Sequence, residues 1–380
     1  MKSFQTMFLH GMLMVDRHRI SDAGKAKSQY LTPLVDMYYY ETGLSTELGR
    51  RVALETGSVS PIVITKALDE VLGNHYRFLG IDYLPQSYLD KVHPSPVLPI
   101  YENMTYASEA ATPKDHGEFP PMVSHLNYLE GILEEQAIRN FFHSKGKEPR
   151  RCIFSECVPG GTSTASLTLS ALYGKHIPTP SSSKNPEITR RKEVLVRTAL
   201  SVVDLSPFKK AYSEGNLDPQ FFRYTSDQFQ LQLLNLLYWG AVQRLFAKNV
   251  EYILAGGSQM LAVVAMLRFV LGRNSAEYRY FLQNVKVVTT SWVHRSILAC
   301  PQMSEIVKEL GVAFIHPDFD FDPETASPAL LRYNEGFTGE GCGMGAALYQ
   351  AKQSGMSNRT ITDVVSAHLD RQKAEMSNHA

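Results

Sequence analysis

The second half of the chain alternates short apolar runs with longer segments of mixed polarity, and several of the junctions are glycine turns. Short buried runs are typical of strands, and the longer segments are typical of helices. Strands that alternate with helices favour a parallel sheet covered on both faces, which is a three-layer α/β fold. The predicted strands are Cys152–Ser155, Val250–Leu254, Val285–Thr289 and Val312–Ile315, and the predicted helices are Ala165–Tyr173, Glu187–Leu200, Gln259–Leu271, Val293–Ala299 and Met303–Leu310.

The first 150 residues show a weaker pattern. Residues 1–60 alternate polar and apolar positions without a strong period, and the apolar strand expected before Ile20 is poorly formed. Residues 84–121 carry many prolines and turn residues and predict a surface segment. The elements that stand out are a helix over Ile62–Leu72, a strand over Arg77–Tyr83 and an amphipathic helix over Leu126–Phe142.

Composition narrows the class of protein. The 380 residues are 44% apolar and 20% charged, which is typical of a globular protein with one large domain and a satellite, or with two domains. Lysine plus arginine equals aspartate plus glutamate at 38 each, so no global charge attracts nucleic acid or a membrane surface. The four cysteines lack CxxC spacing, and no apolar run reaches the ~20 residues that span a bilayer. We therefore expect a cytoplasmic protein without a zinc cage.

The first glycine turn follows the strand over Cys152–Ser155. Glycines let backbone N–H groups approach a phosphate, and the start of the next helix adds partial positive charge. The lysine of a P-loop is absent, so a single phosphate or a phosphoribosyl group fits better than a triphosphate. Glu156 repels a phosphate, which suggests that it handles a proton or a cationic reacting centre. The phosphate candidates are Gly160, Gly161, Thr162, Ser163 and Thr164.

A second turn, Gly256-Gly257-Ser258, repeats this chemistry one strand–helix unit later. Such turns are common at sheet edges, and one alone is weak evidence for a binding site. Because ligands of parallel sheets bind at the carboxyl ends of the strands, two turns there support each other.

The third segment, Glu335–Gly345, places Glu340 between two of its five glycines. A carboxylate packed among backbone is poorly solvated, so we expect a raised pKa, which suits a general base. The competing interpretation is a flexible surface loop with an exposed glutamate. The spacing Gly341-x-Gly343-x-x-Ala346 matches a dinucleotide fingerprint, but no apolar strand precedes it and too little chain follows.

Other chemistry-bearing residues have simpler explanations. His294 and His316 are more typical of structural histidines than of catalytic ones. Asp318, Asp320 and Asp322 alternate with phenylalanines, which indicates a solvated acidic edge rather than a metal cluster.

Together the three glycine segments resemble the nicotinate-nucleotide:dimethylbenzimidazole phosphoribosyltransferases, especially the branch found in archaea and cyanobacteria. Weaker similarities extend the match over most of residues 20–350. The three glycine segments together are specific for this family, whereas any one of them alone would not be. The main matches are Glu156-x-x-Pro159-Gly160-Gly161-Thr162-x-Thr164, Leu254-Ala255-Gly256-Gly257-Ser258-Gln259-Met260 and Glu335-Gly336 through Glu340-Gly341-Cys342-Gly343, and the weaker ones are Ile20-Ser21-x-Ala23-Gly24, Thr32-Pro33-x-x-Asp36, Ser181-Ser182-Ser183 and Thr289-Thr290.

The resemblance implies transfer of phosphoribose from nicotinate mononucleotide to a benzimidazole-like base, with release of nicotinate. The product is an α-ribotide for the lower ligand of cobamides such as vitamin B12. It implies Glu340 as general base and Glu156 as a second carboxylate that positions the proton path or stabilises charge on the ribosyl carbon. Phosphate and ribose are expected at Gly160, Gly161, Thr162, Ser163, Thr164, Gly256, Gly257, Ser258, Gly341 and Gly343, and the acceptor base at Ser21, Asp36, Asp227, Phe229 and Gln230.

The resemblance also implies a homodimer, no metal and no cofactor, with the mononucleotide and an aromatic base as small-molecule partners. A Rossmann-like domain over 61–329 would lie beside a smaller, mainly helical and loop domain built from 1–60 and 330–380.

Two alternatives remain open. The first is a non-catalytic nucleotide-binding relative with an altered acceptor pocket. It is suggested by Ser226-Asp227-Gln228-Phe229-Gln230, which stands where the branch usually has Gly-Asp-Pro-Met-Gln. A nicotinamide-dependent oxidoreductase is the other, and it rests only on the dinucleotide fingerprint.

Overall fold

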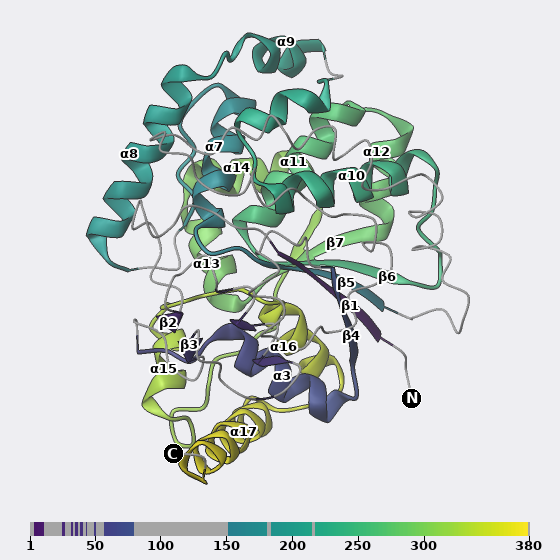
Figure 1. Ribbon diagram of the computed structural model, residues 1–380. Coiled ribbons are helices and arrows are strands. Elements are labelled where there is room, and N and C mark those ends of the chain that lie inside the picture. Colours follow the sequence, from purple (N-terminus) through teal and green to yellow (C-terminus); the bar gives the residue numbers. More distant parts are fainter. Residues whose placement is uncertain are drawn as a thin grey trace, which may run out of the picture.

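A computed structural model describes residues 4–10, 25–26, 32, 35–36, 39–40, 43, 49–50, 57–79, 151–180, 184–214 and 217–378. Its centre is a six-stranded sheet in the order β4-β1-β5-β6-β7-β8, in which every neighbouring pair is parallel (Figure 1). These strands are β1 (Phe4–His10), β4 (His75–Leu79), β5 (Arg151–Cys157), β6 (Glu251–Ala255), β7 (Val285–Val288) and β8 (Ala313–Ile315), and a short antiparallel pair joins β2 (Lys25–Ala26) and β3 (Gly49–Arg50).

Helices cover both faces of the sheet, as the alternation of strands and helices predicts. Side chains alternate along β6: Tyr252 and Leu254 enter the main core, whereas Ile253 and Ala255 face Ala346 on the other side. The main core packs against α7 (Gly161–Tyr173), α10 (Gln228–Val242) and α11 (Ser258–Leu271), and its other helical elements are α8 (Pro186–Val202), α9 (Ser206–Glu214), η4 (Pro219–Tyr224), α12 (Ala276–Asn284), α13 (Ser291–Ala299) and α14 (Pro301–Leu310).

A second core lies on the opposite side of the sheet, at the bottom of Figure 1. There α3 (Pro61–Leu72) packs against α16 (Met344–Gln353) and α17 (Asn358–Asn378), next to α15 (Pro328–Asn334). Aromatic side chains fill its centre, with Trp292 stacked on Phe321 at 5.9 Å between ring centroids. This group joins α3 to the C-terminal helices of the chain. The division into two domains stays a prediction.

Strand β1 differs from the sequence-based expectation. Residues 1–60 are predicted to lie in the smaller domain, yet β1 pairs with β4 on one side and with β5 on the other. The reason is that backbone hydrogen bonds join neighbouring strands whatever side chains they carry. The run Phe4–His10 has four apolar residues of seven without strict alternation, so its pattern does not predict a central strand. Likewise β4 starts at His75, two residues before the predicted strand. The helix expected over Leu126–Phe142 and the segment 84–121 lie outside the described residues.

No helix in the described part of the chain is long and apolar enough to span a membrane.

An ionic network holds α17 against α3. The Tyr39 hydroxyl and Nε2 of His368 lie 2.9 Å apart, and Nδ1 of the same histidine lies 3.2 Å from a carboxylate oxygen of Glu70. Lys66 adds an ion pair at 2.9 Å. The hydrogen bond with His368, helped by Lys66 and opposed by burial, lowers the pKa of Glu70 from 4.5 to about 2. Because the folded pKa lies below the unfolded one, this stabilisation is present above about pH 4.5 and is lost as the pH falls towards 2.

We therefore expect the Glu70→Gln variant to melt about 1–3 °C below the parent at pH 7, a small change because Glu70 is partly exposed. The difference in Tm should shrink as the pH falls from about 5 to 3, since the parent loses the charge that the variant already lacks. Melting curves across this range test it, with the exposed Glu193→Gln as control. A Tm difference that does not change with pH would contradict the assignment.

Candidate active site

Three helices start at one edge of the sheet, where their preceding strands end. The helices α7, α11 and α13 begin just after β5, β6 and β7, and these strands are direct neighbours. Neither α7 nor α11 has a side-chain hydrogen bond at its N-cap, which is a glycine in both cases. The first N–H groups of such helices are suited to bind an anion. Both glycine turns singled out in the sequence thus lie side by side at this edge.

The carboxylate of Glu340 is held at the same edge by four donors. Its Oε2 accepts hydrogen bonds from the Thr289 hydroxyl at 3.0 Å and from the Thr290 N–H at 2.8 Å, directly after β7. Its Oε1 accepts from the N–H groups of Gly341 at 3.2 Å and Gly345 at 2.9 Å. Burial raises the pKa of Glu340 to about 7, although these four bonds oppose the rise. The expected increase is confirmed, and such a carboxyl exchanges a proton near neutral pH.

Glycines around Glu340 are required by close contacts. A Cβ at Gly345 would lie 2.6 Å from Oε2 of Glu340 and equally close to the Thr289 backbone. Gly343, with φ of 73°, caps the start of α16, and Gly339 accepts a bond from the Thr290 hydroxyl at 2.6 Å. Gly341 and Gly343 therefore hold the loop and its glutamate in place, whereas their predicted contact with phosphate or ribose stays untested.

Glu156 lies at the end of β5, close to Glu340. It is 7% exposed, and its Oε2 accepts a hydrogen bond from the Val158 N–H at 2.9 Å. Burial raises the pKa of Glu156 to about 8, opposed by the Val158 bond and reinforced by the charge of Glu340. Two carboxyl groups with raised pKa values at one sheet edge are typical of functional sites.

Gln259 connects Glu156 to the first glycine turn. Its side chain hydrogen-bonds Glu156 and lies against Gly161, where an added Cβ would be 2.1 Å from Oε1. That Oε1 is buried and has no hydrogen-bond partner among the described residues. At the second turn, a Cβ at Gly257 would approach Val293 to 2.6 Å. Packing between helix starts thus explains both glycines, and it leaves an unsatisfied acceptor beside Glu156.

The predicted acceptor residues of segment 226–230 lie behind the first turn. Asp227 accepts a hydrogen bond from the Thr164 hydroxyl and caps α10 through the Gln230 N–H at 2.9 Å. Gln230 accepts from the Thr168 hydroxyl at 3.1 Å, and Phe229 lies in the main core. Asp227 is 2% exposed and the other two 0%, so this structure leaves them no surface for an acceptor base. Their chemistry is explained by helix capping and by packing of α10 on α7.

The remaining predicted residues divide between two places. Asp36 is buried and lies beside the thiols of Cys157 and Cys342 in the second core. Ser163 is buried with no partner for its hydroxyl among the described residues, and Ser258 begins α11. Ser21 and Ser181-Ser182-Ser183 lie outside the described residues.

The structure adds a cation that sequence reasoning misses. Lys192 of α8 donates a hydrogen bond to the Thr162 hydroxyl at 3.1 Å. This places an ammonium group at the turn predicted to bind phosphate. The only signal in the sequence is the basic character of the helix over Glu187–Leu200, which does not single out one residue.

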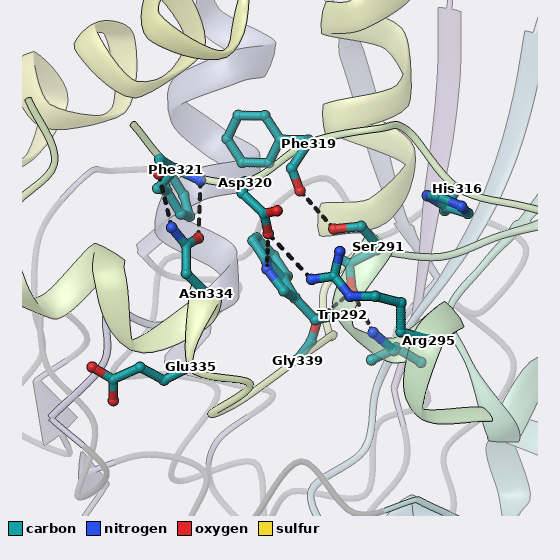
Figure 2. A network of polar contacts seen from close by, with 12 residues as sticks. Ser291, Trp292, Arg295, His316, Phe319, Asp320, Phe321, Asn334, Glu335 and Gly339 are labelled. Atoms are coloured by element: carbon teal, nitrogen blue, oxygen red, sulfur yellow. Dashed lines mark hydrogen bonds and ion pairs between the residues drawn. The ribbon is translucent and has the colours of Figure 1, made fainter. Parts of the chain in front are cut away.

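A network of polar contacts supports the segment that follows β8 (Figure 2). Asp320 accepts hydrogen bonds from the Trp292 indole at 2.6 Å and from Arg295 at 3.3 Å. Asn334 bonds the backbone of Phe321 in both directions, at 2.9 and 2.8 Å. Asp320 is thus partnered by α13 while its side chain stays 49% exposed, which agrees with the expected solvated edge, and its neighbours Phe319 and Phe321 are buried.

His294 and His316 also have structural contacts. Their rings lie 4.2 Å apart between centroids, and His294 stacks on Phe314 at 4.9 Å.

Comparison with known proteins gives relatives over most of the chain, although no family model matches it. Proteins named UPF0284 protein are 25% identical over 351 residues in Thermococcus gammatolerans, 24% over 341 in Pyrococcus abyssi and 26% over 335 in Gloeobacter violaceus. The alignments cover 88%, 90% and 87% of this chain, and 96%, 88% and 78% of the relatives.

Two solved structures from Thermus thermophilus share the fold. One is described as CobT and the other as a nicotinate-nucleotide-dimethylbenzimidazole phosphoribosyltransferase. Both have a TM-score of 0.51 and cover 96% of this chain, at 12% and 13% identity, and the chain covers 84% and 83% of theirs. The similarity to nicotinate-nucleotide:dimethylbenzimidazole phosphoribosyltransferases that the glycine segments indicate is thereby confirmed at the level of the fold.

Proposed function

We propose that this protein is a phosphoribosyltransferase that moves phosphoribose from nicotinate mononucleotide to a benzimidazole-like base. The product would be an α-ribotide for the lower ligand of cobamides, and nicotinate would be released. One observation carries the proposal: the carboxylate of Glu340 lies at the same sheet edge as the glycine turn of α7. Glu156 connects the two, because it interacts with Glu340 and with Gln259, which lies against that turn.

The sheet edge offers separate places for the two ends of the nucleotide. The N-terminus of α7 and the ammonium group of Lys192 supply positive charge for the phosphate. Glu156 and Gln259 supply acceptors for ribose hydroxyls or for the cationic ribosyl carbon. The similarity of the fold to the two Thermus thermophilus structures supports this arrangement.

The reaction balances with Glu340 as base. The unprotonated ring nitrogen of the incoming benzimidazole-like base attacks C1′ of the ribose, and the other ring nitrogen loses its proton to the Glu340 carboxylate. The bond between C1′ and the pyridinium nitrogen breaks, and its electron pair neutralises the pyridinium, which leaves as nicotinate. Charge on C1′ develops in an oxocarbenium-like transition state, which a carboxylate such as Glu156 stabilises. The hydrogen bonds from Thr289, Thr290 and Gly345 fix the direction of the proton-accepting oxygens.

The alternative of a non-catalytic relative loses its main support. It depends on Phe229 narrowing an acceptor pocket, and this side chain lies in the main core. The acceptor therefore has to be identified by assay with a panel of aromatic bases. A homodimer, which the resemblance implies, remains part of the proposal.

We expect the Glu340→Gln variant to lose about 10²–10⁴-fold in kcat, because an amide keeps the size of the side chain but accepts no proton. Binding of nicotinate mononucleotide should be retained. Nicotinate release with a panel of benzimidazoles and phenols measures turnover. Calorimetric titration measures binding of nicotinate mononucleotide. The matched control is Glu335→Gln, an exposed glutamate of the same segment, which should turn over like the parent. Parental turnover of Glu340→Gln would exclude Glu340 as the base.

We expect the Lys192→Ala variant to bind nicotinate mononucleotide about tenfold or more weakly, which is the usual effect of losing one hydrogen bond to a charged group. Binding of the nucleoside that lacks the phosphate should not change. The exposed Lys209→Ala of α9 serves as control. Equal losses for nucleotide and nucleoside would show that Lys192 acts on the fold and not on the phosphate.

A further inference from the structure

Three groups with affinity for metals meet inside the second core. The Cys157 thiol lies 3.1 Å from Oδ2 of Asp36, and the Cys342 thiol lies 3.5 Å from the same oxygen. One ligand atom from each residue lies within 4.8 Å of the other two. All three residues are at most 4% exposed, and they come from segments far apart in the chain. The proposed function uses neither thiol.

The spacing matches that of a tetrahedral metal site. With zinc–sulfur bonds of about 2.3 Å and zinc–oxygen bonds of about 2.0 Å, tetrahedral angles place sulfur and oxygen about 3.5 Å apart and two sulfurs about 3.8 Å apart. The two observed sulfur–oxygen distances are 3.1 and 3.5 Å, and the sulfurs lie within the same 4.8 Å limit. For a cation to bind, the two sulfur–oxygen distances would therefore change by at most about 0.4 Å.

The charge balance of the cluster also permits a divalent cation. With both thiols protonated and Asp36 ionised, the three side chains carry one negative charge. Binding of a divalent cation releases the two thiol protons, and the sum of two thiolates, one carboxylate and the cation is again one negative charge. Binding from that state would leave the net charge of the three side chains and the ion unchanged.

The backbone at both cysteines is fixed before any metal binds. The Cys342 N–H donates to the Glu156 carbonyl at 2.8 Å, which joins the loop to the end of β5 next to Cys157. The Thr65 hydroxyl donates to the Cys342 carbonyl at 2.9 Å. Cys342 itself has a φ of 50°, in the left-handed region that non-glycine residues rarely adopt. This rare conformation directs its thiol to Asp36.

We propose that Asp36, Cys157 and Cys342 form a binding site for a thiophilic divalent cation, with Zn²⁺ as the preferred ion. Two thiolate sulfurs and one carboxylate oxygen bind the ion, and a water molecule completes four-coordination. Such a site would join the segment at Asp36, the end of β5 and the loop before α16. The expectation of no metal stays untested, and this proposal departs from it.

The test uses the full-length protein, reduced and freed of metal by a chelator. Titration with Co²⁺ should give about one ion per chain, with the sulfur-to-cobalt absorption and the visible bands of tetrahedral thiolate coordination. Zn²⁺ should displace Co²⁺ and raise the Tm. No stoichiometric uptake, or uptake without thiolate absorption, would overturn the proposal.

Serine variants separate a metal site from a cluster of hydrogen bonds. Cys157→Ser and Cys342→Ser keep a donor for Asp36, so a hydrogen-bonded cluster would survive, but each should weaken metal binding more than about 100-fold. Cys300→Ser, at a half-buried thiol bonded to Pro178, should bind like the parent. Parental affinity in Cys157→Ser and Cys342→Ser would refute the assignment.

If these variants do not fold, alkylation of the parent protein in mild denaturant decides. Zn²⁺ should slow the modification of Cys157 and Cys342 more than that of the buried Cys152, which gains only from the higher overall stability, as mapped by mass spectrometry. Equal protection of Cys152, Cys157 and Cys342, or no protection, would count against the site.

Discussion

The placement of one carboxylate depends on hydrogen bonds from two distant parts of the chain. Thr289 and Thr290 extend β7 and bind one oxygen of Glu340, whereas the backbone of Gly341 and Gly345 at the start of α16 binds the other. The same threonine, Thr290, also binds the Gly339 carbonyl. A side chain with both oxygens occupied in this way has one orientation, so the sheet edge decides where Glu340 points.

Close approach of backbones is the second constraint on this edge. Gly161, Gly257 and Gly345 each lie where a Cβ would come within 3.0 Å of a neighbouring atom. These contacts link the starts of α7, α11, α13 and α16 in turn, and Gln259 fills the space between Gly161 and Glu156. The glycines serve packing as much as ligand access, because the helix starts converge only where side chains are absent.

Sequence patterns predict the regular part of this architecture well. The strands β5 to β8 and the helices after them have strong apolar runs or clear caps, and their order alone places both glycine turns at one edge. The pattern fails for β1, whose pairing rests on backbone bonds between strands distant in sequence. It also fails for Asp227 and Phe229, since a motif does not show which side of a turn its residues face. Lys192 is missed, and Gln259 appears only inside a matching segment without a role, because the importance of both comes from contacts between separate helices.

The two glutamates of the candidate site lie on opposite sides of a long stretch of chain. Glu156 lies near the end of β5, and Glu340 follows β8, the last strand of the sheet in the chain. The residues of both glycine turns are therefore synthesised before Glu340 and before the helix α16 whose start holds it. Under the proposed function, chemistry would require the C-terminal helices to be in place.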